Sequence, residues 1–403
     1  MKPFTRLQML LILVVLGVFP LVFLTGCWSS VELNSRSFVR MILLDKADDG
    51  IELTLAFPLA NRLIPGQAGT TGEQTGKPYT YITKKGRDIG EAYRLIQSDL
   101  SRKITFGQTS VVVIGRELAK AGISQMLEFV AREPRFHINA NIFVTTGKAL
   151  EVTKVPIIFE RFLTDILIAY GREHVTLKIT TTDCLKALYN GGDMILPLLK
   201  VETKTIPSEN PRQHDWLGTD GAAIFKEAKL VRTASTDEMR GALWILGQLK
   251  DAEVSVQSST DRKNVNYMIN KVKTRIKPTV AGEQTTIYIE TRADASLISS
   301  ESNVDLLDQV ERKKLERGIE ALIEERMTKA IEKSRKVGAD VFHFGSYIDW
   351  HYPRQWKMIA PRWREQYSQH VKVVAQAKIT IKRLGSVKEP MRVHKTSHMG
   401  EKQ

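Results

Sequence analysis

One stretch of the chain, 286-TIYIETRADASLI-298, alternates apolar and polar side chains with a period of two. Such alternation is typical of a strand that buries one face and exposes the other, as antiparallel strands commonly do. Residues 371–382 repeat the pattern, and the lysines on their polar side would keep an exposed face or edge from pairing with other chains. Residues 265–277 alternate as well, but their phase slips near Asn270, which indicates a bulge. These stretches predict a C-terminal antiparallel sheet.

A long helix is predicted between these strands, over residues 304–337. Its apolar residues recur at helical spacing, and Gly338 follows as a cap. Two arrangements fit a single apolar stripe, a coiled-coil seam and a helix lying on a sheet. The repeat is nearer to about 3.6 than to about 3.5 residues, and strands flank the helix on both sides, which favours the sheet. The second half is therefore interpreted as an α+β domain.

The first half mixes strand and helix patterns. Strands are predicted at 37–44, 51–57, 109–114 and 138–145, helices at 88–100, 122–132 and 156–171, and a Gly- and Thr-rich loop at 65–76. The polar passage 205–215 predicts a domain boundary. The expected fold class is thus α+β and multi-domain, with mixed sheets that carry helices and a C-terminal antiparallel sheet with one long helix.

The expected domain organisation has four segments. Residues 1–26 are predicted to be a lipoprotein signal peptide, 27–205 an N-terminal α/β region of one or two subdomains, 216–385 the C-terminal α+β domain, and 386–403 a basic flexible tail.

The composition is basic and poor in cysteine. The 403 residues include 59 Lys and Arg against 45 Asp and Glu, a formal net charge of +14, and two cysteines. Two cysteines are too few for a small disulfide-stapled module, so the chain must fold on hydrophobic cores. The basic charge indicates a polyanionic neighbour, either nucleic acid or an anionic membrane surface.

The N-terminus has the layout of a secretory signal. Two basic residues precede an apolar run of sixteen residues, 9–24, which is shorter than the roughly twenty that span a bilayer. The run ends in Leu24-Thr25-Gly26-Cys27, which resembles the lipobox of bacterial lipoproteins. In that motif the chain is cut between Gly26 and Cys27, and the Cys27 thiol receives a diacylglycerol; an acyl group such as palmitate can follow on the new N-terminus. The alternative is an ordinary secretory signal or short anchor with an incidental cysteine.

Signatures of catalysis, metal binding and cofactor binding are missing from the sequence. It contains no His-Glu-x-x-His, Gly-x-Ser-x-Gly or Cys-x-x-Cys motif. His343 and His351 lie eight residues apart, without partners that would fix a metal geometry. Cys184, in a helix-like segment, is interpreted as a buried structural thiol, because free cysteines are among the most buried residues. We therefore expect neither an enzyme nor a metal or cofactor site.

Nucleic-acid binding is disfavoured by the distribution of the charges. Basic and acidic residues are interspersed, as in the segment 311–316, which is typical of a solvated helix face. The sequence contains no zinc finger, basic zipper or aromatic RNA-binding strand. An exported, lipid-anchored protein meets anionic phospholipid before it meets nucleic acid, so the expected partner is an anionic membrane surface.

The region 342–367 is dense in aromatic and basic side chains. The candidate interface residues in it are Trp350, Trp356, Trp363, Arg354 and Lys357. Amphipathic rings beside cations suit a membrane interface or a protein interface. The alternative is that these rings complete the core between the long helix and the final strand.

Several segments together carry a resemblance to a known family. They are Leu24-Thr25-Gly26-Cys27-Trp28 with Glu32-Leu33-Asn34, Gly122-Ile123 through Arg132-Glu133-Pro134-Arg135, Gly192 to Pro197, Gly218 to Lys226, and Gly338 to Gly345 followed by Trp356 and Trp363. In order and spacing the chain resembles the GerAC-like, or Ger(x)C, lipoproteins, which are the C subunits of spore germinant receptors.

The resemblance implies a non-catalytic, multi-domain α+β lipoprotein that works with two integral membrane subunits of a receptor. It implies that Cys27 anchors the protein on the outer face of the cell membrane or spore inner membrane, where the receptor responds to nutrients and triggers germination. The alternative is an exported substrate-binding lipoprotein that captures the small-molecule germinant itself.

Overall fold

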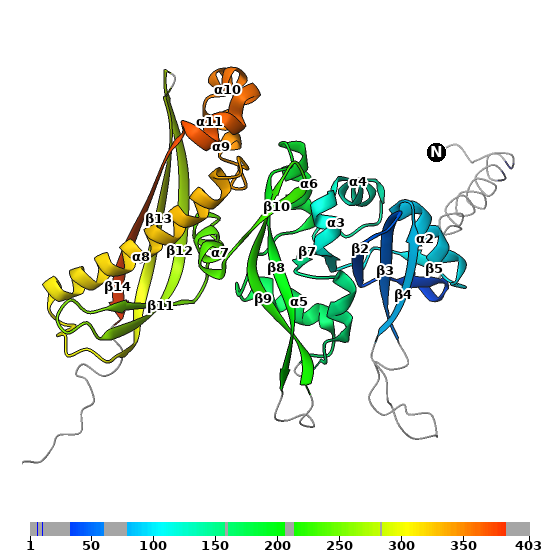
Figure 1. Ribbon diagram of the computed structural model, residues 1–403, viewed down its shortest axis with the longest axis horizontal. Helices are drawn as coiled ribbons and strands as arrows, with labels where there is room; N and C mark the ends of the chain where they lie inside the picture. Colours follow the sequence, from blue (N-terminus) through cyan, green and yellow to red (C-terminus); the bar gives the residue numbers. More distant parts are fainter. Residues whose placement is uncertain are drawn as a thin grey trace, which may run out of the picture.

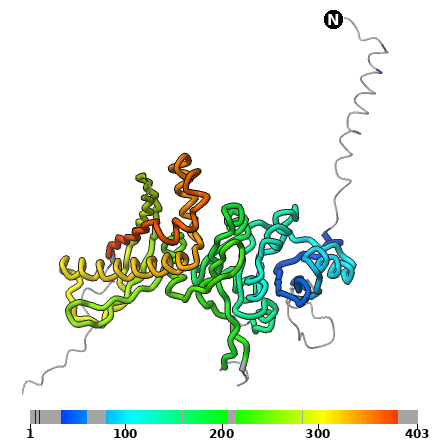
Figure 2. Tube along the Cα trace, turned by 45° about the horizontal axis from the view of Figure 1, so that its top comes forward, coloured from blue at the N-terminus to red at the C-terminus, as the bar shows by residue number. Residues whose placement is uncertain are grey.

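The computed structural model describes residues 33–59, 79–157, 160–205, 213–282 and 284–383, together with Arg6 and Leu10. The predictions for the signal peptide, for Gly26 and Cys27, for the loop at 65–76 and for the tail at 386–403 lie outside the described residues. The molecule is elongated and consists of two bodies, each built on its own sheet (Figure 1). Figure 2 shows from a second angle that the C-terminal strands lie at one end of the molecule.

An eight-stranded mixed sheet forms the N-terminal body. Its strands, in the order in which they lie side by side, are β10 (Lys229–Ala234), β9 (Gln213–Lys226), β8 (Met194–Thr205), β7 (Asn141–Thr145), β6 (Val111–Ile114), β2 (Met41–Ala47), β3 (Gly50–Pro58) and β4 (Tyr79–Gly86). The central strands β8, β7, β6 and β2 run parallel, and antiparallel strands flank them. All of β6 is buried, because a central parallel strand is covered on both faces. A separate parallel pair joins β1 (Arg36–Phe38), which follows the short 3-10 helix η1 (Leu33–Ser35), to β5 (Lys103–Thr105).

Helices cover both faces of the eight-stranded sheet. One face packs against α2 (Ile89–Ser98), α3 (Arg116–Ala121), α4 (Ser124–Arg132) and α6 (Thr181–Tyr189), and the other against the 3-10 helix η3 (Ala149–Lys154) and α5 (Leu163–Arg172). Cys184 of α6 is fully buried in the first of these cores, and burial raises the pKa of its thiol, as expected for a structural cysteine. The N-terminal body is therefore a three-layer α/β unit.

Three predicted segments of this body differ from the structure. The strand predicted at 37–44 divides into β1 and β2, because successive N–H groups at its middle bond to different strands. The helix predicted at 122–132 starts later, because Gly122 adopts a φ of 123° and ends α3. The helix predicted at 156–171 begins only at Leu163.

The domain boundary predicted at 205–215 stays a prediction, and the residues on either side of it pair in one sheet. Thr205 pairs with Gln213, so β8 and β9 form one hairpin, and the sheet continues to the end of β10. Polar residues with proline occur at hairpin ends as well as in linkers, so composition does not distinguish the two. The helix α7 (Thr236–Ile245) opens the C-terminal body, and its buried side chains share one core with the C-terminal sheet and with Ile195, Ala222 and Ile224 of the N-terminal sheet.

The C-terminal body is built on a four-stranded sheet with the order β11 (Ala252–Gln257), β12 (Asn264–Ala281), β13 (Gln284–Ser300) and β14 (Lys372–Arg383). The first three strands are antiparallel, but β14 runs parallel to β13. The prediction of an antiparallel sheet is therefore wrong for the last strand, because side-chain alternation is the same in both directions. The predicted bulge is confirmed, since the register shifts between Asn270 and Lys273.

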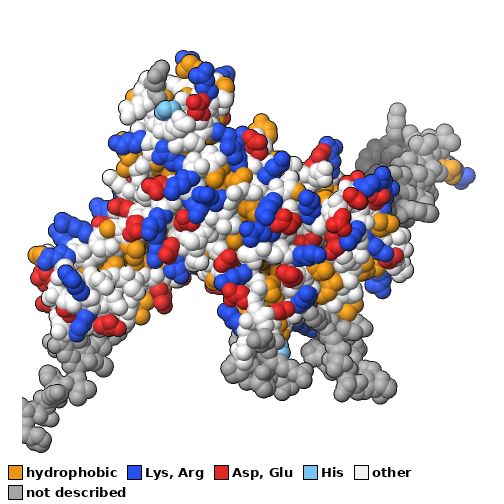
Figure 3. Space-filling view, in the orientation of Figure 1, with side chains coloured by type: hydrophobic (Ala, Val, Ile, Leu, Met, Phe, Trp, Pro, Cys, Tyr) orange, Lys and Arg blue, Asp and Glu red, His pale blue; other side chains and the backbone are white. Residues whose placement is uncertain are grey.

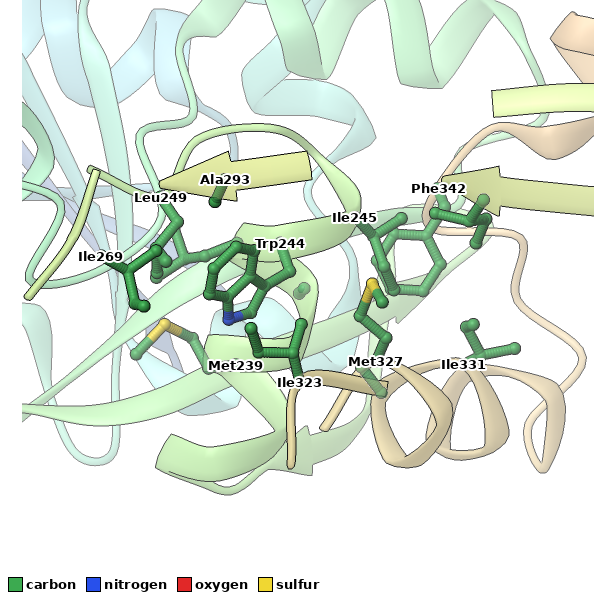
Figure 4. Packing of buried hydrophobic residues seen from close by; sticks show 14 of the residues in the cluster. Met239, Trp244, Ile245, Leu249, Ile269, Ala293, Ile323, Met327, Ile331 and Phe342 are labelled. Carbon is green, nitrogen blue, oxygen red and sulfur yellow. The ribbon is translucent and has the colours of Figure 1, made fainter. Parts of the chain in front are cut away.

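One long helix, α8 (Gln309–Arg335), crosses the sheet and carries the chain toward β14 (Figure 1). Its apolar stripe shares one core with α7 and the sheet, and Figure 4 shows Ile323 beside Trp244 of α7 and Met327 pointing toward Ile245 and Phe342. The interpretation of the stripe as a sheet-packing face is thus confirmed. Between α8 and β14 lie α9 (Phe344–His351), α10 (Pro353–Ile359), the 3-10 helix η4 (Ala360–Arg362) and α11 (Trp363–Gln369).

Three glutamates of α8 occupy the free edge of β14. The carboxylates of Glu316, Glu320 and Glu324 accept hydrogen bonds of 2.8, 2.9 and 2.8 Å from the backbone N–H groups of Ile381, Ile379 and Ala377. Four helical residues rise about 6 Å and two strand residues about 6.6 Å, so the two spacings match. These N–H groups are therefore not free to pair with another chain. The lysines of β14, expected to protect a face or an edge, lie on the exposed face of the sheet.

The glutamate contacts lead to a stability prediction. Glu320→Ala is expected to lower the free energy of unfolding by about 1–3 kcal/mol, because the N–H of Ile379 loses a charged acceptor. Glu320→Gln keeps an acceptor oxygen and should lose less. Glu325→Ala is the control, since Glu325 is exposed and pairs with Lys329 one turn away; its effect should stay within about 0.5 kcal/mol. Urea unfolding followed by circular dichroism measures the free energy of unfolding of each variant. Equal losses of this free energy in Glu320→Ala and Glu325→Ala would contradict the prediction.

Candidate functional site

A buried carboxylate, Asp340, organises the turn that follows α8. Its oxygens accept hydrogen bonds from the N–H groups of Phe344 and Gly345, at 2.9 and 2.8 Å, and from the indole Nε1 of Trp363, at 2.9 Å. The two backbone donors belong to the first turn of α9, where N–H groups need acceptors and a negative charge is favourable. One side chain thereby joins the start of α9 to the start of α11.

The surroundings of Asp340 assign it a structural role. Burial raises the pKa of the Asp340 carboxyl, and the N–H donors oppose that rise. Both of its oxygens already accept hydrogen bonds from protein groups. The carboxylate therefore holds the turn in place and is not arranged to take a proton from a ligand.

A second buried carboxylate, Asp193, joins the two bodies. It lies just before β8 and accepts hydrogen bonds from the backbone N–H groups of Glu227 and Asp340, at 3.2 and 3.1 Å. Its Oδ1 pairs with Nη2 of Arg364 in α11 at 3.0 Å. The same guanidinium donates to the carbonyl oxygen of Gly191 at 2.8 Å and pairs with the Glu227 carboxylate. One ion pair thus connects the turns of the N-terminal body to the helices after α8.

The predicted interface residues Trp356 and Trp363 belong to the packing around Asp340. Trp363 is only 9% exposed, and its ring meets the half-buried Trp356 edge-on, with 5.4 Å between the ring centroids. The rings crowd Gly345, where a Cβ would lie 2.6 Å from the Trp356 ring. These two rings therefore complete the core, which was the alternative interpretation of this region.

The other predicted interface residues, Trp350, Arg354 and Lys357, are exposed on α9 and α10. Trp350 of α9 is 72% exposed, and Met358 of α10 is 74% exposed. The ring of Tyr347 contacts Trp350 edge-on. The structure thus divides the predicted set into the buried Trp363 with the half-buried Trp356, and three exposed residues. We call Trp350, Arg354 and Lys357, together with the exposed Met358, the α9–α10 patch.

A cleft of about 640 Å³ lies where the two bodies meet. Residues of the α6–β8 turn form one wall, and residues of α9, η4 and α11 form the other. The polar groups that line it include Tyr189, His343, Asp349 and Arg362, beside the indole of Trp356. Clefts at domain junctions are common places for small ligands to bind.

Sequence reasoning did not single out Asp193 or Arg364. Each was one charged residue among many, and their partners are distant in the chain. A signal was nevertheless present, because the segments 192–197 and 338–345, which carry the family resemblance, contain Asp193 and Asp340. The structure explains why these two short segments belong together, since the backbone N–H of Asp340 bonds to the carboxylate of Asp193.

The described part of the chain holds neither a metal-binding cluster nor a membrane-spanning helix. Within it, no three His, Cys, Asp or Glu side chains gather in a way that could hold a metal ion. Over the same ranges, no helix is both long enough and apolar enough to cross a membrane.

Two family models cover most of the chain. Residues 29–201 match the spore germination protein N-terminal domain, and residues 220–385 match the C-terminal domain described as spore germination B3/GerAC like. The chain belongs to the spore germination B3/GerAC-like family. The resemblance noted from the sequence is thereby confirmed.

Two proteins of Bacillus subtilis and one solved structure are similar to this chain over most of its length. Spore germination protein KC of Bacillus subtilis strain 168 is 24% identical over 405 residues, covering 94% of this chain and 97% of its own. Spore germination protein B3 of the same organism is 23% identical, covering 87% and 92%. The crystal structure of the GerBC protein matches with a TM-score of 0.53 at 18% identity, over 85% of this chain and 98% of that one. This likeness confirms the multi-domain α+β fold.

The bonding of Trp363 leads to a second prediction. Trp363→Phe is expected to lower the free energy of unfolding by about 1–3 kcal/mol, because the buried Asp340 loses its indole donor. Trp350→Phe is the matched control and should change it by less than about 0.5 kcal/mol, since Trp350 is exposed. Urea unfolding followed by far-ultraviolet circular dichroism compares them without relying on tryptophan fluorescence. Similar effects of the two substitutions would refute the assignment of Trp363 to the core.

Proposed function

We propose that this protein is the lipid-anchored C subunit of a spore germinant receptor. Membership of the germination family over most of the chain carries the proposal. The leader that ends in Leu24-Thr25-Gly26-Cys27 supports the anchor. In this function the folded bodies do no chemistry; they support receptor assembly and signalling that triggers germination.

The anchor would hold the folded bodies close to the membrane. Each buried methylene contributes about 0.8 kcal/mol, so one acyl chain binds a membrane marginally and two make release slow. The described fold begins at Leu33, six residues after Cys27, and six residues span at most about 20 Å. A diacylated Cys27 would therefore place the N-terminal body against the outer face of the cell membrane or spore inner membrane.

The partners in this function are two integral membrane subunits of the receptor. The α9–α10 patch is suited to contact them, because exposed aromatic and arginine side chains are enriched in protein interfaces. Its base is held by the bonds of Asp340 and Asp193, so the patch is carried on a rigid support. Docking there would leave the cores of both bodies undisturbed.

Cys27→Ala tests the anchor. The variant is expected to leave the membrane fraction and to impair nutrient-triggered germination, because the diacylglycerol has no thiol to join. Fractionation of spore membranes with immunodetection, together with germination assays on nutrients, measures both effects. Cys184→Ala is the control, since Cys184 is buried in α6 and should not affect anchoring. Unchanged fractionation of Cys27→Ala would defeat the anchor.

The cleft favours a second function, capture of a small germinant by an exported binding lipoprotein. Titration calorimetry of an unlipidated chain, residues 29–403, with amino acids and sugars separates the two functions. This chain retains every helix and strand of the described fold from Leu33 onward. The receptor-subunit proposal expects no binding heat. Saturable binding that is lost in Trp356→Ala, which alters the cleft, but kept in Trp350→Ala would favour direct capture.

A further inference from the structure

One face of the C-terminal sheet is open to solvent. The other face carries Ile287, Ile289 and their neighbours, which pack against α7, α8 and α9. On the open face the side chains of β12, β13 and β14 point away from these helices, and none of the described helices covers them. The C-terminal body therefore has two layers, in contrast to the three layers of the N-terminal body.

The open face is strongly basic. Its exposed cations are Lys271, Lys273, Arg275, Lys277, Arg292, Lys372, Lys378 and Lys382. Its acids are Glu253, Glu290 and Asp294. On the side of the molecule that carries α8, by contrast, Lys and Arg are interspersed with Asp and Glu (Figure 3). The excess charge of the C-terminal sheet is thus concentrated on one surface, which we call the basic face.

A row of like charges crosses the basic face. Lys273 lies directly opposite Arg292 on the next strand, and Arg292 lies directly opposite Lys378. Like charges in register across a sheet are destabilising. Arg292 also pairs with Glu290, but the lysines on either side of it have no acid opposite them in the register. A sheet that served stability alone would alternate the signs here, so the row indicates a surface that binds an anion-rich partner.

We propose that the basic face lies against an anionic phospholipid bilayer. Six of its eight cations are lysines, which present flexible point charges on long stems and suit a diffuse layer of headgroups. Surfaces that bind single-stranded nucleic acid carry several aromatic rings on which successive bases stack. Among the described residues of the basic face, Tyr288 alone offers an exposed ring, which disfavours nucleic acid as the partner. Lysine is depleted at the centre of protein interfaces, whereas lysines are concentrated on this face, which disfavours a protein as the partner.

This inference rests on the proposed lipid anchor, which brings the face to the membrane, and it adds an orientation. With the basic face on the bilayer, α8 and α9 lie on the opposite side of the sheet. The α9–α10 patch is then carried by helices that pack on the far side of the sheet from the lipid, where it remains available to protein partners. Two anchoring elements, the acyl chains ahead of the N-terminal body and the basic face of the C-terminal body, would each hold one of the two bodies, which lie at opposite ends of the molecule (Figure 1).

Vesicle binding of the unlipidated chain 29–403 tests the basic face separately from Cys27. The chain should sediment with vesicles of phosphatidylcholine that contain about 30 mol% phosphatidylglycerol and not with pure phosphatidylcholine. Binding should fall steeply between about 0.1 M and about 0.5 M KCl, because exposed charges are screened. Absence of binding to the anionic vesicles at low salt would overturn the proposal, while Cys27→Ala fractionation would still report on the anchor alone.

A matched pair of variants locates the contact. Lys273→Glu with Lys378→Glu should weaken vesicle binding by about tenfold or more, while its midpoint of urea unfolding stays the same or rises, because both glutamates would face Arg292. Lys313→Glu with Arg317→Glu, on the exposed side of α8, changes the net charge equally and should weaken binding by less than about threefold. Equal losses in both variants, or tighter binding to duplex DNA than to vesicles, would refute the proposal.

Discussion

The ion pair of Asp193 and Arg364 joins the two bodies alongside a hydrophobic core that they share, in which Ile195, Ala222 and Ile224 of the N-terminal sheet belong to the same cluster as α7 and the C-terminal sheet. Asp193 follows the α6–β8 turn, and Arg364 lies in the helix that precedes the last strand, so the contact joins positions 171 residues apart. Asp193 also accepts a hydrogen bond from the backbone N–H of Asp340, so the ion pair positions the turn that contains Asp340. The Asp340 carboxylate in turn accepts hydrogen bonds from the first residues of α9 and α11. Both carboxylates are buried, and each has the donors that a buried charge requires.

The glutamates of α8 have a comparable role in the C-terminal body. By accepting the edge N–H groups of β14, they let a parallel strand end the sheet without leaving an edge that another chain can extend. The helix therefore covers one face and one edge together. The other face is left to carry charge, and its row of like cations is tolerated because the core on the opposite side supplies the stability.

Patterns within single segments predicted much of the fold. The alternation around Ile287 and the stripe of α8 identified a sheet with a helix on it, because both patterns report which side of a segment is buried. The direction of β14 and the break at Gly122 were missed. Strand direction depends on the path of the connecting chain, and the break depends on a local backbone conformation that a helical pattern does not report.

The sequence by itself determined the family, the α+β class and the buried state of Cys184, and it predicts the lipid anchor at Cys27. These follow from local motifs and from side-chain periodicity, which are properties of neighbouring residues. Only the tertiary structure decided that Trp363 is core while Trp350 is surface, that Asp193 meets Arg364, and that the Lys and Arg side chains of three strands share one open face. Each of these depends on which distant segments are brought side by side, and burial and charge are properties of that assembled surface.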